Sequence, residues 1–184
     1  MWLHCSKWSL ALAVFLSAVT TIKAREYEVL RVETEFQPDK LCDLSKIRVK
    51  KLRPGVYGFD GQAEVLQTVG NDTKVAIKLY YSANGADKYQ LLPHHLNPGS
   101  VCDFMNNDYK KYVPDLYKVS DFPHVEDEYY CPLPKGVYKV RKYQFDFESL
   151  PKIFKPGYYK AQGIIELDNG DKSIINVFVK VNGP

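Results

Sequence analysis

A strict alternation of apolar and polar residues is the feature that most constrains this sequence. Apolar or small residues occupy every second position over residues 159–167, and the pattern returns over residues 175–181 after the turn sequence Asp168-Asn169-Gly170-Asp171. Successive side chains of a β-strand point to opposite faces, so each run predicts a strand with one apolar face. An Asn-Gly between two such runs is typical of a β-hairpin.

The same alternation recurs along most of the chain. It predicts antiparallel strands near residues 26–36, 44–53, 56–69, 73–82, 137–147, 157–167 and 172–182. The runs 56–69 and 73–82 flank the turn Gly70-Asn71-Asp72, so we expect them to form a second antiparallel hairpin. Antiparallel connections can join all these strands. The predicted fold is therefore all-β, an antiparallel β-sandwich or cup of six to seven strands.

One helical insert interrupts the strands. Apolar and aromatic residues recur at helical steps between Phe104 and Val113, after Pro98-Gly99 and before Pro114, which predicts a helix near residues 100–112. Cys102 lies in this insert and Cys131 follows it. A bridge between them would close a loop of about 30 residues and stabilise the fold by roughly 3 to 4 kcal/mol. Cys42 is then the odd cysteine, either buried or paired with another molecule.

The N-terminal segment determines the expected compartment. His4 and Lys7 precede an apolar stretch over residues 10–19, which is followed by Ile22-Lys23-Ala24. This is the three-part layout of a secretory signal peptide, cleaved after Ala24. A membrane anchor is the alternative, but the apolar stretch is about half of the roughly 20 residues that span a bilayer. We expect a signal peptide at 1–24 and a single secreted, extracellular β domain at 25–184, in which a disulfide can form.

The charge pattern does not favour a nucleic-acid partner. The formal net charge is +3 and becomes +1 without Lys7 and Lys23. The densest basic cluster, residues 46–53, is interleaved with apolar residues, which is typical of a solvated strand face.

A glycosylation sequon, Asn71-Asp72-Thr73, lies at the tip of the second expected hairpin. A secreted fold presents such a turn to solvent, so Asn71 is a candidate site for an N-linked glycan.

Catalytic patterns are missing from the sequence. His94, His95 and His124 are the histidines that follow the expected signal peptide, and adjacent histidines on an extended chain point to opposite sides. A zinc site would need further ligands, for which Glu126 and Asp127 are the local candidates. No serine lies in a nucleophile elbow and no phosphate-binding loop occurs. We expect no catalytic residue, no metal and no cofactor, and a metal-dependent hydrolase is the less favoured alternative.

Large and very small residues share the expected inward faces. The small residues are Gly61, Ala63, Ala161 and Gly163. Two outcomes are compatible with this mixture. The core is either filled, as in a secreted interaction protein without a ligand, or the sheets part and leave an apolar cavity for a hydrophobic ligand. The sequence does not decide between them.

If the insert roofs a cup, strand alternation gives the residues of the cavity walls. Phe104 and Met105 would look inward at one end, and the walls would be formed by Phe59, Val65, Ile77, Leu79, Tyr143, Phe145, Tyr159, Ile165 and Val177. Residues 91–96 are apolar at both ends, with Pro93 and two histidines between them. They are the candidate rim, where a membrane surface or a receptor would touch the protein.

Several motifs in order resemble those of a known family. They are Val101-Cys102-Asp103-Phe104, Tyr109-Lys110-Lys111-Tyr112, Cys131-Pro132, Lys135-Gly136-Val137-Tyr138, Pro151 and Pro156-Gly157-Tyr158-Tyr159-Lys160. Together they look like the insect secreted proteins of the CheA/CheB type, a group that resembles the ganglioside activator protein and, more distantly, the ML lipid-recognition fold. The resemblance covers roughly residues 27–181.

The resemblance implies a β cup that holds a lipid or a hydrocarbon-like ligand. It also implies a role in the gustatory detection of contact pheromones, with a chemoreceptor as a partner. Ganglioside activators carry several disulfide bridges, whereas the three cysteines expected in the mature chain permit one internal bridge. No catalytic residue is carried over from the family.

Overall fold

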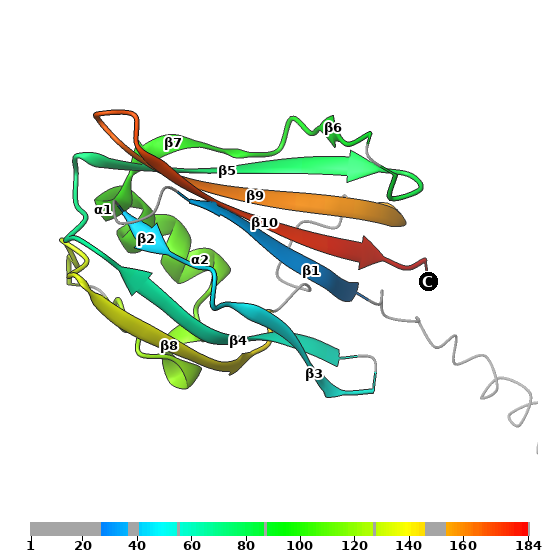
Figure 1. The fold of residues 1–184 in the computed structure, drawn as a ribbon, viewed down its shortest axis with the longest axis horizontal. Coiled ribbons are helices and arrows are strands. Elements are labelled where there is room, and N and C mark those ends of the chain that lie inside the picture. The colour runs from blue at the N-terminus through cyan, green and yellow to red at the C-terminus, as the bar shows by residue number, and fades with distance from the viewer. Residues whose placement is uncertain are drawn as a thin grey trace, which may run out of the picture.

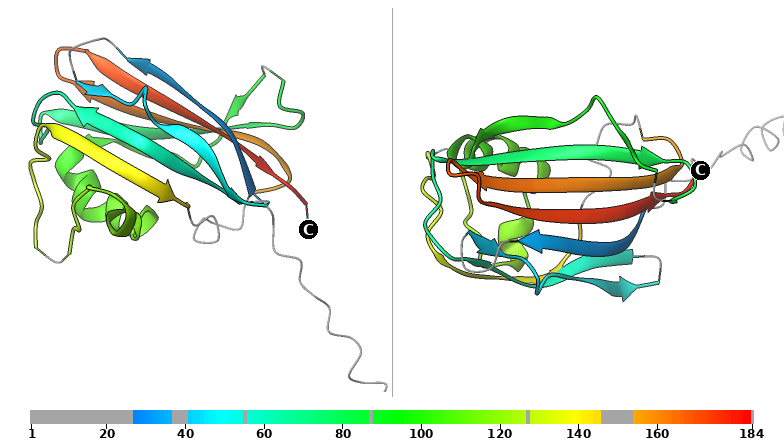
Figure 2. Two further views of the ribbon diagram at one scale, coloured as in Figure 1. Left: turned by 60° about the horizontal axis from the view of Figure 1, so that its bottom comes forward. Right: turned by 45° about the horizontal axis from the view of Figure 1, so that its top comes forward.

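A computed structural model describes residues 27–36, 41–54, 56–86, 88–126, 128–145 and 154–183. The expected signal peptide at 1–24 lies outside the described residues. Within them, the chain forms two antiparallel sheets and one short helical segment (Figure 1), and Figure 2 shows the same layers from two further sides. The predicted all-β sandwich with a helical insert is confirmed.

The larger sheet contains the C-terminal hairpin at its centre. Its main strands follow the order β1 (Tyr27–Phe36), β10 (Lys172–Val181), β9 (Gly157–Leu167) and β5 (Thr73–Ser82). Two short strands, β6 (Gln90–Leu91) and β7 (Leu96–Ser100), pair with the other edge of β5. The smaller sheet is built on β4 (Val56–Val65), which pairs with β2 (Cys42–Asp43), β3 (Arg48–Arg53) and β8 (Gly136–Tyr143).

The predicted hairpin of β9 and β10 is confirmed. The two strands pair from Gly157 opposite Val181 to Glu166 opposite Lys172. The Gly170 amide donates to the Leu167 carbonyl at 2.9 Å, and Gly170 has φ +87°. The loop that contains Asn169-Gly170 has three residues, so it is longer than the two-residue turn that Asn-Gly commonly forms. Gly170 adopts the left-handed conformation that closes such a loop without a steric penalty.

The second predicted hairpin, between residues 56–69 and 73–82, is wrong. β4 pairs with strands of the smaller sheet, whereas β5 pairs with β9 in the larger sheet. The connection between them crosses from one sheet to the other, and Val69 exchanges backbone hydrogen bonds with Leu133 at 2.9 and 3.0 Å. Alternation shows which face of each strand is buried. It does not show whether two strands that follow each other in the sequence pair in one sheet or lie in opposite sheets, because their apolar faces are buried in either arrangement.

The helical insert runs over α1 (Val101–Phe104), a π-helical turn η1 (Met105–Tyr109) and α2 (Lys110–Tyr112), as predicted. The Ser100 hydroxyl accepts a hydrogen bond from the Asp103 amide at 3.0 Å and caps its start. None of the helices in the described part of the chain is long and apolar enough to cross a membrane.

The predicted disulfide is confirmed. Cys102 and Cys131 are bonded with their Cα atoms 5.4 Å apart, and Cys42 is free and buried. Beside the bridge, the side-chain amide of Asn106 forms two hydrogen bonds with the backbone of Tyr130. Its Oδ1 accepts from the Tyr130 amide at 2.8 Å, and its Nδ2 donates to the Tyr130 carbonyl at 3.0 Å.

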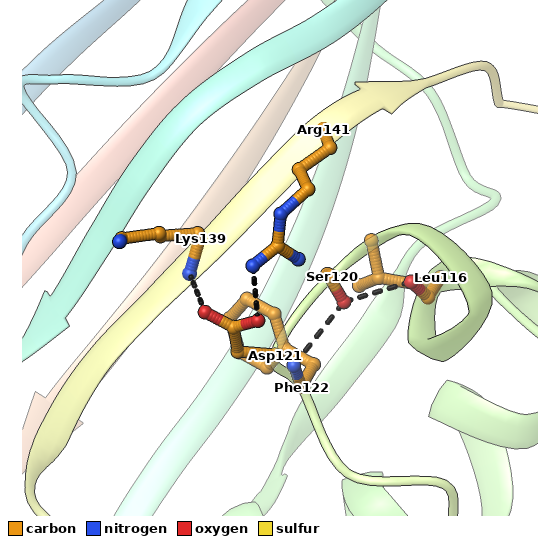
Figure 3. Close-up of polar contacts among 6 residues, drawn as sticks. All are labelled: Leu116, Ser120, Asp121, Phe122, Lys139 and Arg141. Carbon is orange, nitrogen blue, oxygen red and sulfur yellow. Dashed lines mark hydrogen bonds and ion pairs between the residues drawn. The ribbon is translucent and has the colours of Figure 1, made fainter.

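The chain between the helix and Cys131 lies along β8. After a short helix η2 (Leu116–Val119), Ser120 pairs with Val140 of β8, and the Asp121 amide donates to the Lys139 carbonyl at 2.9 Å. Figure 3 shows that the Asp121 carboxylate accepts from the Lys139 amide at 3.2 Å and from the Arg141 guanidinium at 2.6 Å. The insert is therefore tied to the smaller sheet as well as to the disulfide.

Replacing both bridged cysteines, Cys102→Ala with Cys131→Ala, should lower the free energy of unfolding by about 3 to 4 kcal/mol, because the unfolded chain regains the entropy of a long loop. Urea denaturation followed by circular dichroism measures the change. The control is Cys42→Ala, which should leave the bridge intact in a peptide map. A bridge that involves Cys42 would contradict the structure.

Asp121 should contribute to the pH dependence of stability. Hydrogen bonds from Arg141 and from the Lys139 amide hold the pKa of this carboxyl below its ordinary value of 3.8. A lowered pKa in the folded state stabilises the protein above the unfolded pKa, and this contribution is lost as the pH falls through the folded pKa. The stability difference between the wild type and Asp121→Asn should therefore shrink below about pH 4.

The control for this measurement is Asp115→Asn, which removes an exposed carboxylate that contacts Lys118 of the same insert. A difference between wild type and Asp121→Asn that stays constant from neutral to acid pH would show that the ion pair with Arg141 does not form in solution.

Candidate functional site

Among the described residues, the buried side chains form three separate clusters rather than one continuous core. The first joins the helical insert to both sheets through Met105 and Tyr109, together with Val65 of β4 and Val75 of β5. The second lies on the smaller sheet around Val140 and Tyr143. The third lies at the far end of the larger sheet around Phe154, Tyr159 and Val181.

A cavity of about 450 Å³ lies where these clusters meet. Its lining includes buried members of the third cluster and partly buried side chains packed against the other two. The residues that line it are Tyr27, Phe59, Ile77, Leu79, His94, His95, Leu96, Phe104, Tyr112, Val113, Phe145, Phe154, Tyr159, Ala161, Val177, Val179 and Val181. Apart from the two histidines and three tyrosine hydroxyls, these side chains are apolar.

The inner face of the larger sheet forms the floor of the cavity. Ala161 of β9 stands between Leu79 of β5 and Val177 of β10 in one cross-strand row. A methyl group between two larger side chains leaves a hollow in the sheet surface. The next small residue, Gly163, makes no such hollow, because an added Cβ would lie only 3.0 Å from Cγ2 of Ile175.

The helical insert and the smaller sheet form the opposite wall. The insert contributes Phe104, Tyr112 and Val113, and the smaller sheet contributes Phe59, with Phe145 just beyond β8. The apolar side of the helical insert therefore contributes side chains both to the core and to the wall of the cavity. Met105 and Tyr109 are buried in the core, where burial raises the pKa of the Tyr109 hydroxyl to about 12, while their neighbours on the helix face the cavity.

The mouth of the cavity is identified by the solvent exposure of two of its lining residues. His94 and His95 are the exposed members of the lining, whereas the other lining side chains are buried or half-buried. The expectation that adjacent histidines on an extended chain point to opposite sides stays a prediction. The chain between β6 and β7 is not a strand at these two residues, and both of them line the cavity.

Seven of the predicted wall residues line this cavity: Phe59, Ile77, Leu79, Phe104, Phe145, Tyr159 and Val177. Four others lie elsewhere. Val65 and Met105 are buried in the first cluster, Ile165 packs against that cluster, and Tyr143 is buried in the second. Alternation predicted the inward direction of these side chains but not their position along the sandwich. That any of these residues binds a ligand stays a prediction.

Sequence reasoning missed several lining residues. Val179 and Val181 continue the face of Val177 at steps of two, and Tyr27 is paired with Val181 on the next strand, so the signal was present in the alternation. Phe154 follows a stretch without alternation and gave no such signal. Its ring meets that of Tyr159 edge-on with centroids 4.9 Å apart, and the Tyr159 hydroxyl donates to the Lys155 carbonyl at 2.8 Å.

Among the described residues, no acidic side chain and no lysine or arginine lines the cavity. His124, the third candidate histidine, lies apart from it: its ring stacks on Tyr117 at 3.6 Å, and its Nδ1 is 3.1 Å from Glu126. Asp127, the other proposed zinc ligand, lies outside the described residues. Over the part of the chain that is described, no group of three or more His, Cys, Asp and Glu side chains could hold a metal ion.

Cys42 has no features of a nucleophile. It is buried, burial raises the pKa of its thiol, and its carbonyl accepts a hydrogen bond from the Ser173 hydroxyl at 3.1 Å. Asn71, the candidate glycosylation site, is exposed in the turn before β5. The Asn71 turn begins β5 in the larger sheet rather than closing a hairpin.

Residues 75–161 match the model of a family that is described as a protein of unknown function (DUF1091). The matched stretch begins in β5 and ends in β9, so it contains the helical insert, both bridged cysteines and β8. No curated protein matches the chain. The description of the family names no ligand and no activity.

Ala161→Phe should fill the cavity, because the new ring takes the hollow between Leu79 and Val177. We expect the free energy of unfolding to stay within about 1 kcal/mol of the wild type, since the ring meets open space rather than packed atoms. Uptake of an apolar fluorescent dye such as N-phenyl-1-naphthylamine should fall at least about tenfold, a loss of roughly 1.4 kcal/mol of binding.

The matched control is Ile164→Phe, which places the same ring on the opposite face of β9 and should leave dye uptake unchanged. A loss of about 1 to 3 kcal/mol of stability in Ala161→Phe, as overpacked cores show, would mean that the space is filled in solution.

Proposed function

We propose that this chain is a secreted binding protein for a lipid or another hydrophobic small molecule. The observation that carries the proposal is the apolar cavity of about 450 Å³ between the two sheets and the helical insert. Ligand sites are typically concave, largely apolar and a few hundred Å³ in volume, with a small number of polar groups that orient the ligand. The cavity has each of these properties.

The volume of about 450 Å³ lies toward the lower end of the range of about 300–1,000 Å³ that is typical of ligand pockets, which favours a ligand with one apolar tail over a bulky lipid. Each buried methylene contributes about 0.8 kcal/mol, which offsets the cost of association once the tail is long enough. Apolar walls discriminate weakly between tails that differ by one methylene. The proposal therefore names a class of ligand.

Binding is better supported than catalysis. An enzyme site needs an acid, a base, a nucleophile or metal ligands that converge on one point. The described residues that line this cavity include tyrosines and two histidines at its mouth but no carboxylate to orient a histidine, and His124 is not among them. We propose that the chain is not an enzyme, and a metal-dependent hydrolase is not supported by a specific observation.

A secreted interaction protein with a filled core is the other candidate. Its core would be one continuous cluster, whereas the buried residues here form three clusters around a common space. This arrangement supports a ligand-binding protein.

The finer parts of the proposal come from the resemblance to insect proteins of the CheA/CheB type. They are a role in gustatory or pheromone perception and a relationship to the ganglioside activator and ML lipid-recognition fold. The rim residues 91–96 would contact a membrane surface, which the exposed Leu91, 56% accessible beside the mouth, supports. A chemoreceptor is the other partner that the resemblance implies. Secretion and a glycan on Asn71 belong to the same proposal, and the disulfide is compatible with an oxidising compartment.

Native mass spectrometry tests the proposed function. The protein, secreted from cultured insect cells, should carry a small-molecule adduct that organic extraction releases, and the stripped protein should bind one equivalent of a fatty acid, a glycolipid or a long hydrocarbon from a mixed panel. Ala161→Phe should lose the adduct, and Ile164→Phe should keep it. A stripped wild-type protein that binds nothing from the panel would overturn the proposed function.

A further inference from the structure

The lining of the cavity combines buried side chains with two exposed histidines. Tyr159 and Val181 are 5% and 2% exposed, and the Tyr159 hydroxyl already donates to the Lys155 carbonyl. At the mouth, His94 and His95 are exposed and line the same space. A ligand inside would therefore have one end among apolar side chains and the other beside two imidazoles.

The two histidines bring a specific chemistry to the mouth. They are the lining residues whose side chains contain nitrogen, and an imidazole has at least one N–H donor whether it is neutral or protonated. In the described part of the chain, no acidic side chain lines the cavity to compete for these donors or to repel an anion. Hydrogen bonds to a charged acceptor are roughly twice as strong as those between neutral groups. The mouth therefore favours an anionic oxygen over a hydroxyl or an ester.

We infer that the cavity selects single-chain amphiphiles with an anionic oxygen head group, and that His94 and His95 bind this head group at the mouth while the tail lies against Ala161 and Val177. The inference rests on the proposed function, because it assigns a polarity and a direction to the same ligand. Carboxylates and alkyl phosphates share the required chemistry.

Probes with one common tail test this selectivity. Dodecanoic acid, dodecyl phosphate, 1-dodecanol and methyl dodecanoate each displace N-phenyl-1-naphthylamine from the stripped protein at one pH near neutrality, below the aggregation concentration of each probe. We expect the acid, the phosphate or both to bind at least about tenfold more tightly than the alcohol and the ester, the ratio that a charge-assisted hydrogen bond provides over a neutral one. The acid and phosphate arms show which anion the mouth prefers.

Two variants assign the selectivity to the histidines. His94→Ala with His95→Ala should reduce the affinity for the anionic probes to that for the alcohol and leave the alcohol unchanged. His94→Lys with His95→Lys should restore the preference, because an ammonium also donates to an anion. His124→Ala is the matched control, a histidine outside the cavity lining, and should bind all four probes as the wild type does.

Each failure has a separate meaning. Equal binding of all four probes by the wild type would overturn the head-group inference and leave the proposed function intact, whereas no binding of any probe would overturn the proposed function itself. An anion preference that persists in the double alanine variant would overturn the role of the histidines. If that variant does not fold, the single variants and the wild-type ranking of the probes still decide the inference.

Discussion

The structure depends on the burial of one face of the helical insert between two sheets. Met105 and Tyr109 belong to one buried cluster that also contains Val65 of β4 and Val75 of β5, so the insert joins the two sheets. Phe104, Tyr112 and Val113 of the same segment line the cavity, so the packing of the insert also places one wall of the cavity.

The alternation in the sequence predicted which face of its strand each side chain occupies. It did not predict which residues and strands lie next to one another. Phe59 and Val65 lie on the same face of β4, yet Phe59 lines the cavity and Val65 is in the core beside the helix. At about 3.3 Å per residue, the two are roughly 20 Å apart along the strand. The position of a wall residue depends on the place of the insert, which local periodicity does not contain. The crossing from β4 to β5 was missed for a related reason, because β8, which pairs with β4, and β9, which pairs with β5, are both distant in the chain.

Ligand binding and folding are coupled in such an architecture. An apolar side chain that faces a cavity lacks the dispersion contacts that a filled core would give it. A ligand that supplies these contacts binds the folded chain and not the unfolded one, so it raises the apparent stability by mass action. The disulfide and the Asn106 clamp on Tyr130 act independently of a ligand, since they connect the insert to the chain that returns from it. They hold the wall in place whether or not the cavity is occupied.

The basic strand β3 has a consequence for the solution behaviour of the molecule. It stands at the edge of the smaller sheet, where Arg48, Lys50, Lys51 and Arg53 are exposed and Lys50 is bound to Asp60 at 2.8 Å. An unpaired strand edge can recruit another chain, and lysines on it make that recruitment costly because two copies would repel each other. A protein with an accessible apolar interior is otherwise exposed to self-association. The charges of β3 thus protect against fibril-like growth along the same sheet that helps to enclose the apolar space.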